Sequence, residues 1–258
     1  MWRLSLLWLA VGCGGRNKPA ANSDALSGIE SGFVEISIDE SEDELIGSEI
    51  LQATAPCGDL VKLEPASLMG RLSDGEIRCL DETLRASDRQ TVKNKLSRVL
   101  LADAWAKGDT HRWETIARRH LEEIDRSDPT LCYKLANHLS AKGADSADET
   151  LKWAEVALDN RTQWTGDEYV KRVYALYRLK AVAAQTKWQG LEERYVAKPD
   201  ETLLQEKDLA RNQAKTLARE WLEYARSSGK DATIALQICT SAAGTATFCD
   251  ETTSTPTP

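Results

Sequence analysis

One pattern occurs twice between residues 95 and 160, and this repeat constrains the fold more than any other feature. The first halves of the repeats match at an offset of 35 residues, at Leu100 and Leu135, Ala104 and Leu139, and Gly108 and Gly143. The second halves match at an offset of 37, at Trp113 and Thr150, Ala117 and Ala154, His120 and Ala157, and Leu121 and Leu158. Each repeat reads as a helix, a turn with glycine, and a second helix. A period in the middle thirties is typical of helical hairpins that bury their apolar faces against one another. The sequence therefore predicts an all-α fold of stacked antiparallel hairpins.

The composition favours helices over sheet and argues against nucleic acid as a partner. Only two Phe and two Met occur, and Ala, Leu, Trp and Tyr supply the apolar volume, a mixture that favours helix over sheet. The net charge is −8, but nine acidic residues and no Lys or Arg lie between residues 19 and 56. Beyond residue 56 the chain has 32 acidic against 30 basic residues, so we expect no general attraction to nucleic acid.

The first twelve residues have the layout of a secretory signal peptide. Arg3 gives a positive start, residues 4–11 (LSLLWLAV) are apolar, and Gly12 is a small residue before Cys13. The apolar run is too short for a permanent membrane-spanning helix. We therefore expect residues 1–12 to be removed and the protein to be exported.

Residues 9–13 (LAVGC) resemble the lipobox of bacterial lipoproteins. The resemblance implies that Cys13 becomes the first residue and is lipidated, which would anchor the protein to a membrane. Gly14 follows the cysteine. By resemblance to lipoprotein sorting, this residue implies the outer membrane, with the protein on its periplasmic side or at the cell surface.

The sequence predicts a lipidated, acidic, flexible linker over residues 13–55, a helical-repeat domain over 56–250 and a disordered tail over 251–258. Within the linker, residues 33–38 (FVEISI) alternate apolar and polar side chains. This stretch is either a motif that pairs with the sheet edge of a partner, a slightly apolar linker, or a strand that folds back on its own domain.

Helix signals divide the domain into successive elements. A short helix is expected over 66–72, and Ser73 with Glu76 forms a capping box that begins a helix ending near Arg85. The repeat helices are expected over 88–107, 109–126, 130–142 and 146–160, with Asp109 and Asp128 as N-caps. Three further helices are expected over 167–189, 201–228 and 231–243.

The repeat resembles that of tetratricopeptide-repeat proteins. The matching positions are Leu135, Ala136, Leu139, Gly143, Ala154, Ala157 and Leu158, with weaker copies at Leu100, Leu101, Ala104, Gly108 and Ala117. The resemblance implies a degenerate solenoid whose concave groove holds a partner.

Five cysteines remain if Cys13 carries lipid, and an odd number leaves one thiol unpaired in an oxidising compartment. Several pairings are possible. Local spacing favours Cys57 with Cys79 and Cys239 with Cys249, because each pair would close a short loop. Cys132 is expected to be a buried free thiol.

No pattern in the sequence points to catalysis, a metal or a cofactor. His111, His120 and His138 are not spaced to share one helix face as metal ligands. A glycine-rich phosphate loop and a GxSxG elbow are both absent from the sequence. Adjacent carboxylates such as Glu122 and Glu123 point apart on a helix. We therefore predict a protein that is not an enzyme.

Most tryptophans lie at core spacing, and Trp105, Trp153, Trp188 and Trp221 are expected to pack between helices. Trp164 lies between two helices, so exposure is expected. Together with Arg161, Tyr169 and Arg172 it forms the predicted partner-binding cluster, because exposed aromatic and Arg side chains are common binding hot spots. Arg118 with Arg119 is a second candidate, or a solvated helix face.

The resulting hypothesis is a membrane-anchored helical scaffold that binds another protein of the bacterial cell envelope. The alternative is an envelope receptor that holds a small ligand or glycan fragment in a pocket around the helix that begins near Asp167.

Overall fold

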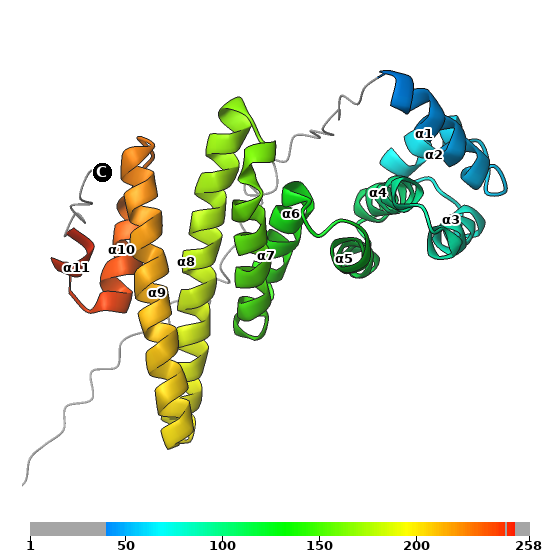
Figure 1. Cartoon of the computed structure of the whole chain (residues 1–258). Coiled ribbons are helices and arrows are strands. Elements are labelled where there is room, and N and C mark those ends of the chain that lie inside the picture. Colours follow the sequence, from blue (N-terminus) through cyan, green and yellow to red (C-terminus); the bar gives the residue numbers. More distant parts are fainter. Residues whose placement is uncertain (1–39, 246, 251–258) are drawn as a thin grey trace, which may run out of the picture. The chain divides into compact units, whose positions relative to one another are not determined.

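The structure is a computed structural model that describes residues 40–245 and 247–250, with side chains from residue 47 to residue 249 apart from 246. The chain divides into two units, Met1–Glu44 and Leu45–Pro258, and the packing below is that of the second unit. Within the described residues every regular element is a helix, so the all-α prediction is confirmed there (Figure 1). Residues 1–12, Cys13, residues 33–38 and residues 251–258 lie outside the described part of the chain.

The helices follow one another with short connections. The α-helices are α1 (Glu40–Thr54), α2 (Leu60–Leu68), α3 (Asp74–Ala86), α4 (Gln90–Ala106), α5 (Thr110–Arg119), α6 (Pro129–Ser140), α7 (Ala147–Asp159), α8 (Gly166–Ala197), α9 (Glu201–Ser227), α10 (Thr233–Ala243) and α11 (Thr247–Asp250). A π-helix, η2 (His120–Ile124), continues α5, and the 3-10 turns η3 (Ala144–Ser146) and η4 (Arg161–Gln163) flank α7.

Three helices begin where the sequence places N-caps. The Ser73 hydroxyl accepts from the Glu76 backbone N–H at 3.3 Å, and the Glu76 carboxylate accepts from the Ser73 N–H at 2.7 Å, which completes the capping box. Asp109 accepts from the Arg112 N–H, and Asp128 accepts from the Leu131 N–H just before Pro129. These caps satisfy N–H groups that have no partner inside the helix.

From α3 onward, consecutive helices pack against one another, whereas α2 packs mainly against α4. Helix α4 contacts α2, α3 and α5, and α6, α7, α8, α9 and α10 then contact one another in order (Figure 1). One continuous core joins Leu63 of α2 to Leu179 of α8, and two smaller clusters lie farther along, around Ala214 and around Trp221. In Figure 1, α4 and α5 are seen nearly end-on whereas α6 to α9 are seen lengthwise, so the two repeat hairpins have differently directed axes.

Polar contacts join the two repeat hairpins. Glu114 of α5 accepts from Arg118 of its own helix at 2.8 Å and from His138 of α6 at 3.0 Å, and it also pairs with Lys142. Arg118 pairs in addition with Glu149 of α7. Although burial opposes ionisation, these donors lower the pKa of Glu114 to about 2.

Arg118 and Arg119, the second candidate pair, do not form a solvated helix face. Both side chains are partly buried, because each one pairs with a carboxylate on another helix. Arg119 donates to Asp81 of α3 at 2.6 Å. The two arginines therefore hold helices of this chain together.

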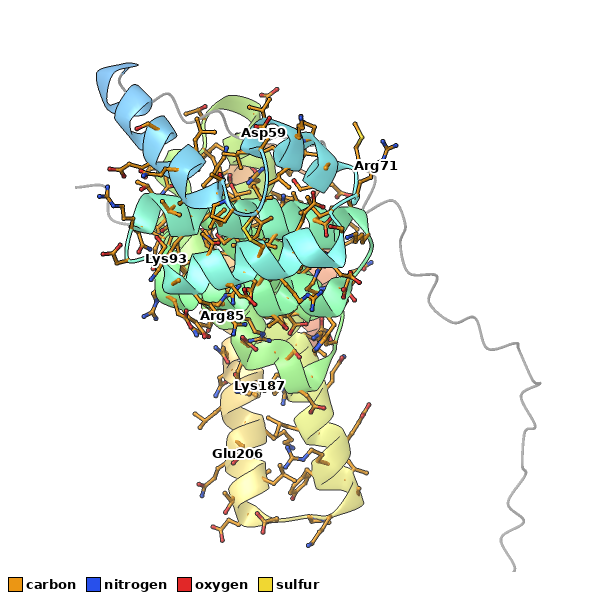
Figure 2. All side chains as sticks on the ribbon, turned by 90° about the vertical axis from the view of Figure 1, so that its right-hand side faces the viewer. Asp59, Arg71, Arg85, Lys93, Lys187 and Glu206 are labelled. Atoms are coloured by element: carbon orange, nitrogen blue, oxygen red, sulfur yellow. A yellow bond between two sulfur atoms is a disulfide. The ribbon has the colours of Figure 1, made fainter. Side chains whose placement is uncertain are left out.

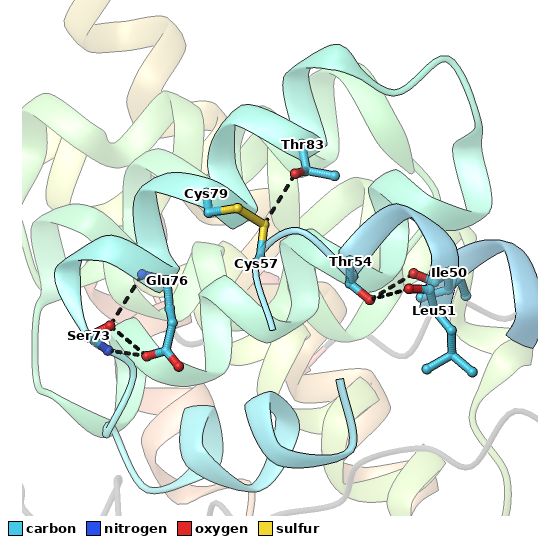
Figure 3. Close-up of a disulfide and its surroundings, with 8 residues drawn as sticks. All are labelled: Ile50, Leu51, Thr54, Cys57, Ser73, Glu76, Cys79 and Thr83. Carbon is cyan, nitrogen blue, oxygen red and sulfur yellow. Dashed lines mark hydrogen bonds between the residues drawn. A yellow bond between two sulfur atoms is a disulfide. The ribbon is translucent and has the colours of Figure 1, made fainter. Parts of the chain in front are cut away.

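The second part of the predicted linker is helical. Helix α1 occupies residues 40–54 and buries Ile50 in the main core, while the Thr54 hydroxyl donates to the Ile50 carbonyl at 2.9 Å (Figure 3). Glu49 also pairs with Arg89. The predicted linker, which ends at residue 55, therefore extends too far along the chain. The acidic composition of this segment concealed the apolar Ile50, which packs α1 against the core.

Helices α8 and α9 are longer than the repeat helices and form one long hairpin. Helix α8 has 32 residues and α9 has 27. Helix α8 ends at Ala197, eight residues past the predicted end at 189. A Cβ at Gly190 would lie 2.8 Å from the Cβ of Ala144, which marks where α8 touches the turn before α7. Beyond this contact the described residues from 192 to 209 include no buried side chain. Figure 2 shows this arm, on which Glu206 marks α9.

The cysteines pair in the two ways that local spacing favours. A disulfide joins Cys57 to Cys79 and fixes the loop after α1 to α3 (Figure 3), and a second joins Cys239 of α10 to Cys249 of α11. Cys132 is a buried free thiol, and burial raises its pKa to about 12. A thiol in this state is a poor nucleophile.

Candidate partner-binding surface

Trp164 does not have the exposure that the sequence predicted. Its side chain is 3% exposed and belongs to the main core, and its indole Nε1 donates to the Thr130 hydroxyl of α6 at 3.0 Å. The turn η4 before it and helix α8 after it bring the ring against α6. Trp164 is therefore buried although it lies in a connection between helices. Its indole N–H has a hydrogen-bond acceptor, and its apolar ring surface is removed from water.

Arg172 lies over this tryptophan. Its Nη1 donates to the same Thr130 hydroxyl at 2.7 Å, and its guanidinium carbon is 5.1 Å from the centroid of the Trp164 ring. The guanidinium also lies 5.9 Å from the ring centroid of Tyr133, and it pairs with Glu168 one turn earlier on α8. Stacking, a hydrogen bond and an ion pair thus fix the orientation of this cation.

Two further residues of α6, Tyr133 and Lys134, complete this group, and neither was predicted from the sequence. Tyr133 is half-buried, and burial raises its pKa while Arg172 and Arg178 oppose the shift. Lys134 is also half-buried, and burial lowers its pKa, an effect that the neighbouring charges of Arg172 and Arg98 reinforce. We call Thr130, Tyr133, Lys134, Trp164 and Arg172 the Arg172 cluster.

The other two predicted residues lie in a second group. Tyr169 and Arg161 lie close to Tyr224 of α9, whose ring stacks on that of Tyr177 with a centroid distance of 4.8 Å. Burial raises the pKa of Tyr224, Tyr169 and Tyr177 add to this shift, and Arg161 opposes it. The four residues that the sequence proposed as one cluster therefore divide into two, with Arg172 and Trp164 against α6 and Tyr169 and Arg161 near α9.

The apolar periodicity of α6 indicates where the unpredicted residues of the Arg172 cluster lie. Leu131, Cys132 and Leu135 are buried, so Thr130, Tyr133 and Lys134 fall on the remaining face of the helix. The sequence does not indicate that Arg172, about 40 residues away, meets this face. Only the packing of α6 against α8 brings them together.

The tryptophans expected in the core are not all buried. Trp153 and Trp221 are buried and Trp188 is half-buried against a core cluster, but Trp105 is 45% exposed. Trp105 packs edge-on against Trp113, with 5.6 Å between ring centroids, at the last turn of α4. Trp105 of α4 therefore packs against α5 as expected, but almost half of its side chain remains exposed.

A hollow of about 500 Å³ lies at the turn between α8 and α9. Its lining residues are Arg194, Ala197, Lys198, Asp200, Thr202, Leu203 and Glu206. All of these except Leu203 are exposed, so the hollow does not enclose a ligand as a small-molecule pocket does.

Within residues 40–245 and 247–250, no three His, Cys, Asp or Glu side chains are placed to hold a metal ion. Among the helices of the same residues, none combines the length and apolar character needed to cross a bilayer.

No protein-family model, curated protein or solved structure matches this chain.

Proposed function

We propose that this chain is a membrane-anchored helical scaffold of the bacterial cell envelope, and that it binds another protein through the Arg172 cluster. In this proposal the protein has a lipid anchor at Cys13, a helical array, and a partner-binding surface. The partner-binding surface is the main support for the proposed function.

The anchor and the compartment rest on sequence features that the disulfides support. A leader followed by LAVGC at residues 9–13 is the basis for lipidation of Cys13. Two intrachain disulfides agree with an exported protein, because disulfides persist in oxidising compartments and are rare in the cytosol. We place the protein at the outer membrane, on its periplasmic side or at the cell surface.

The array consists of the hairpins α4–α5, α6–α7 and α8–α9, which we interpret as a degenerate tetratricopeptide-like solenoid. The order of packing supports this interpretation, because contacts run from each helix to its sequence neighbours as in other helical arrays. Inner helices of such an array present side chains along a continuous surface. We assign α6 and α8, which carry Tyr133, Lys134 and Arg172, to this inner position, and the direct contact between these two helices supports the assignment.

The observation that carries the proposal is the Arg172 cluster. It combines a stacked arginine, a half-buried tyrosine and a half-buried lysine on two adjacent helices. Tyr and Arg are enriched in binding hot spots, where they offer a large contact area and directional hydrogen-bond donors. Arg172 is already oriented by Thr130 and Glu168, so binding would cost little ordering entropy.

A site-specific crosslinking experiment tests this function in the native envelope. A photoreactive amino acid replaces Lys171, which is exposed on α8 beside Arg172, and in a control it replaces Lys230, which is exposed after α9. We expect an adduct of defined mass from position 171, its loss when Lys134→Glu is added, and no such adduct from position 230. Adducts that form equally from both positions, or that persist with Lys134→Glu, would overturn the proposal.

A receptor for a small ligand or glycan fragment is the second candidate, and the hollow at the turn between α8 and α9 is the observation that favours it. Its exposed lining makes it the weaker candidate. Saturable binding of muropeptide fragments that is lost with Glu206→Ala but unaffected by Lys134→Glu would favour this receptor over the scaffold.

A further inference from the structure

The charges around the Arg172 cluster do not balance. Arg98 pairs with Asp128 at 3.0 Å, and Arg172 pairs with Glu168. Lys134 and Arg178 have no carboxylate partner among the residues that the structure describes. Two of these four cations are therefore neutralised by the protein itself, and two are not.

This local excess is opposite in sign to the charge of the whole chain. The chain has a net charge of −8, yet the charges that act on Lys134 are those of Arg172 and Arg98 with Asp128 as the opposing carboxylate. Keeping cations this close costs electrostatic free energy in the unbound protein. An anionic ligand would relieve that repulsion, so binding gains from it.

The surface also offers apolar contact. Tyr133 and Trp164 both lie under the guanidinium of Arg172, and Tyr133 is half-buried rather than covered. Its accessible face lies beside cations that come from α6 and α8. A ligand that fits here has carboxylates for the cations and carbon atoms for the ring.

We propose that the Arg172 cluster binds an extended acidic peptide segment of the partner protein, with its Glu or Asp carboxylates paired to Lys134 and Arg178 and its aliphatic carbons packed on Tyr133. This inference rests on the proposed function and names the chemistry of the partner. An anionic lipid surface fits less well, because membrane attraction depends on clusters of four to eight Lys or Arg. The unpaired cations that act on the cluster, Lys134 and Arg178, are fewer than this, and an aromatic ring lies beside them.

Peptide binding to the full chain carrying Cys13→Ser tests the inference. The probes are a fluorescein-labelled decapeptide of glutamate and its glutamine counterpart, and the measurement is fluorescence anisotropy. We expect saturable binding of the glutamate peptide, no binding of the glutamine peptide, and affinity that falls when sodium chloride is raised to about 0.3 M. We expect Lys134→Gln and Arg178→Gln each to weaken binding by about threefold to tenfold.

Lys230→Gln is the matched control, because it removes one exposed positive charge far along the chain from the cluster. We expect it to change the affinity by less than about twofold. Equal weakening by Lys230→Gln and Lys134→Gln, or equal binding of both peptides, would overturn the inference.

Vesicles of phosphatidylglycerol and inorganic phosphate serve as competitors. Binding of vesicles without binding of the glutamate peptide, or displacement of the peptide by inorganic phosphate at equal concentration, would also overturn the inference. If crosslinks from position 171 remain while the glutamate peptide fails to bind, the partner surface stands and only its acidic chemistry is wrong.

Discussion

Glu114 on α5 accepts a hydrogen bond from the ring Nε2 of His138 on α6, with 3.0 Å between the two atoms. This contact crosses the junction between the two repeat hairpins. Lys142 and Arg118 converge on the same carboxylate, so one acidic side chain joins α5 to α6 and, through Arg118, to α7.

Removing this carboxylate should loosen the junction. We expect Glu114→Gln to lower the free energy of unfolding by about 1–3 kcal/mol, because three donors lose a charged acceptor at a site where Glu114 is largely buried. Urea unfolding followed by far-ultraviolet circular dichroism measures the change. Glu193→Gln, at an exposed position of α8, is the control, and an equal effect of both substitutions would contradict the role of Glu114.

The same carboxylate predicts acid sensitivity at low pH. The pKa of Glu114 falls from 4.5 to about 2 in the folded protein, so its stabilising contribution is complete above about pH 4.5 and is lost as the pH falls toward 2. Urea midpoints measured between pH 5 and about pH 2.5 should therefore fall more steeply for the natural protein than for Glu114→Gln. Parallel slopes for the two proteins would show that Glu114 titrates normally.

His120 should make the free energy of unfolding depend on pH at higher pH values than Glu114 does. It is buried in η2 with Nδ1 2.6 Å from the Ser97 hydroxyl, and its Nε2 has no hydrogen-bond partner among the described residues. Burial lowers its pKa below the ordinary 6.5, so the unfolded chain takes up a proton that the folded chain does not. Stability should therefore be complete above about pH 6.5 and decline below it.

The matched test compares His120→Asn with His111→Asn, which changes an exposed histidine at the start of α5. Urea unfolding is measured between pH 7 and about pH 5.5. We expect His120→Asn to flatten the pH dependence and His111→Asn to leave it unchanged. An unchanged slope with His120→Asn would show that another group titrates.

The disulfide between Cys57 and Cys79 should stabilise the first part of the domain. Replacing both cysteines by serine should lower the free energy of unfolding by about 2–4 kcal/mol, because the open unfolded chain gains entropy. Limited proteolysis should then begin between α1 and α2. The double replacement at Cys239 and Cys249 should cost less, since it opens a shorter loop, and should leave that cleavage site protected.

Trp164 should behave as a core residue. We expect Trp164→Ala to lower the free energy of unfolding by about 3–5 kcal/mol, and Trp164→Phe by less, because phenylalanine keeps the packing and loses the hydrogen bond to Thr130. Chemical unfolding measures both variants. Trp105→Ala is the control at an exposed tryptophan, and a cost equal to that of Trp164→Ala would contradict the burial of Trp164.

Several local features of this chain could be predicted from the sequence. Ser73, Glu76, Asp109 and Asp128 begin helices where expected, because a cap is formed by side chains and backbone groups within three residues of one another. The pairing of Cys57 with Cys79 and of Cys239 with Cys249 was also favoured by short separations. Such features need little information from distant parts of the chain.

The candidate site needed such information. Tyr133 and Lys134 were not singled out in the sequence, and Trp164 was expected to be exposed, because a connection between helices gives no indication of which helix will cover it. The tertiary structure decided both, by placing Thr130 where it accepts hydrogen bonds from Trp164 and Arg172 together.

The helices, their caps and the cysteine pairing were thus determined by interactions between residues near in sequence. The burial of Ile50 in the acidic segment, the junction at Glu114 and the Arg172 cluster were decided by packing between helices that are distant in sequence. Periodicity specifies which face of a helix is apolar, but it does not specify which other helix meets that face or which charges come together there.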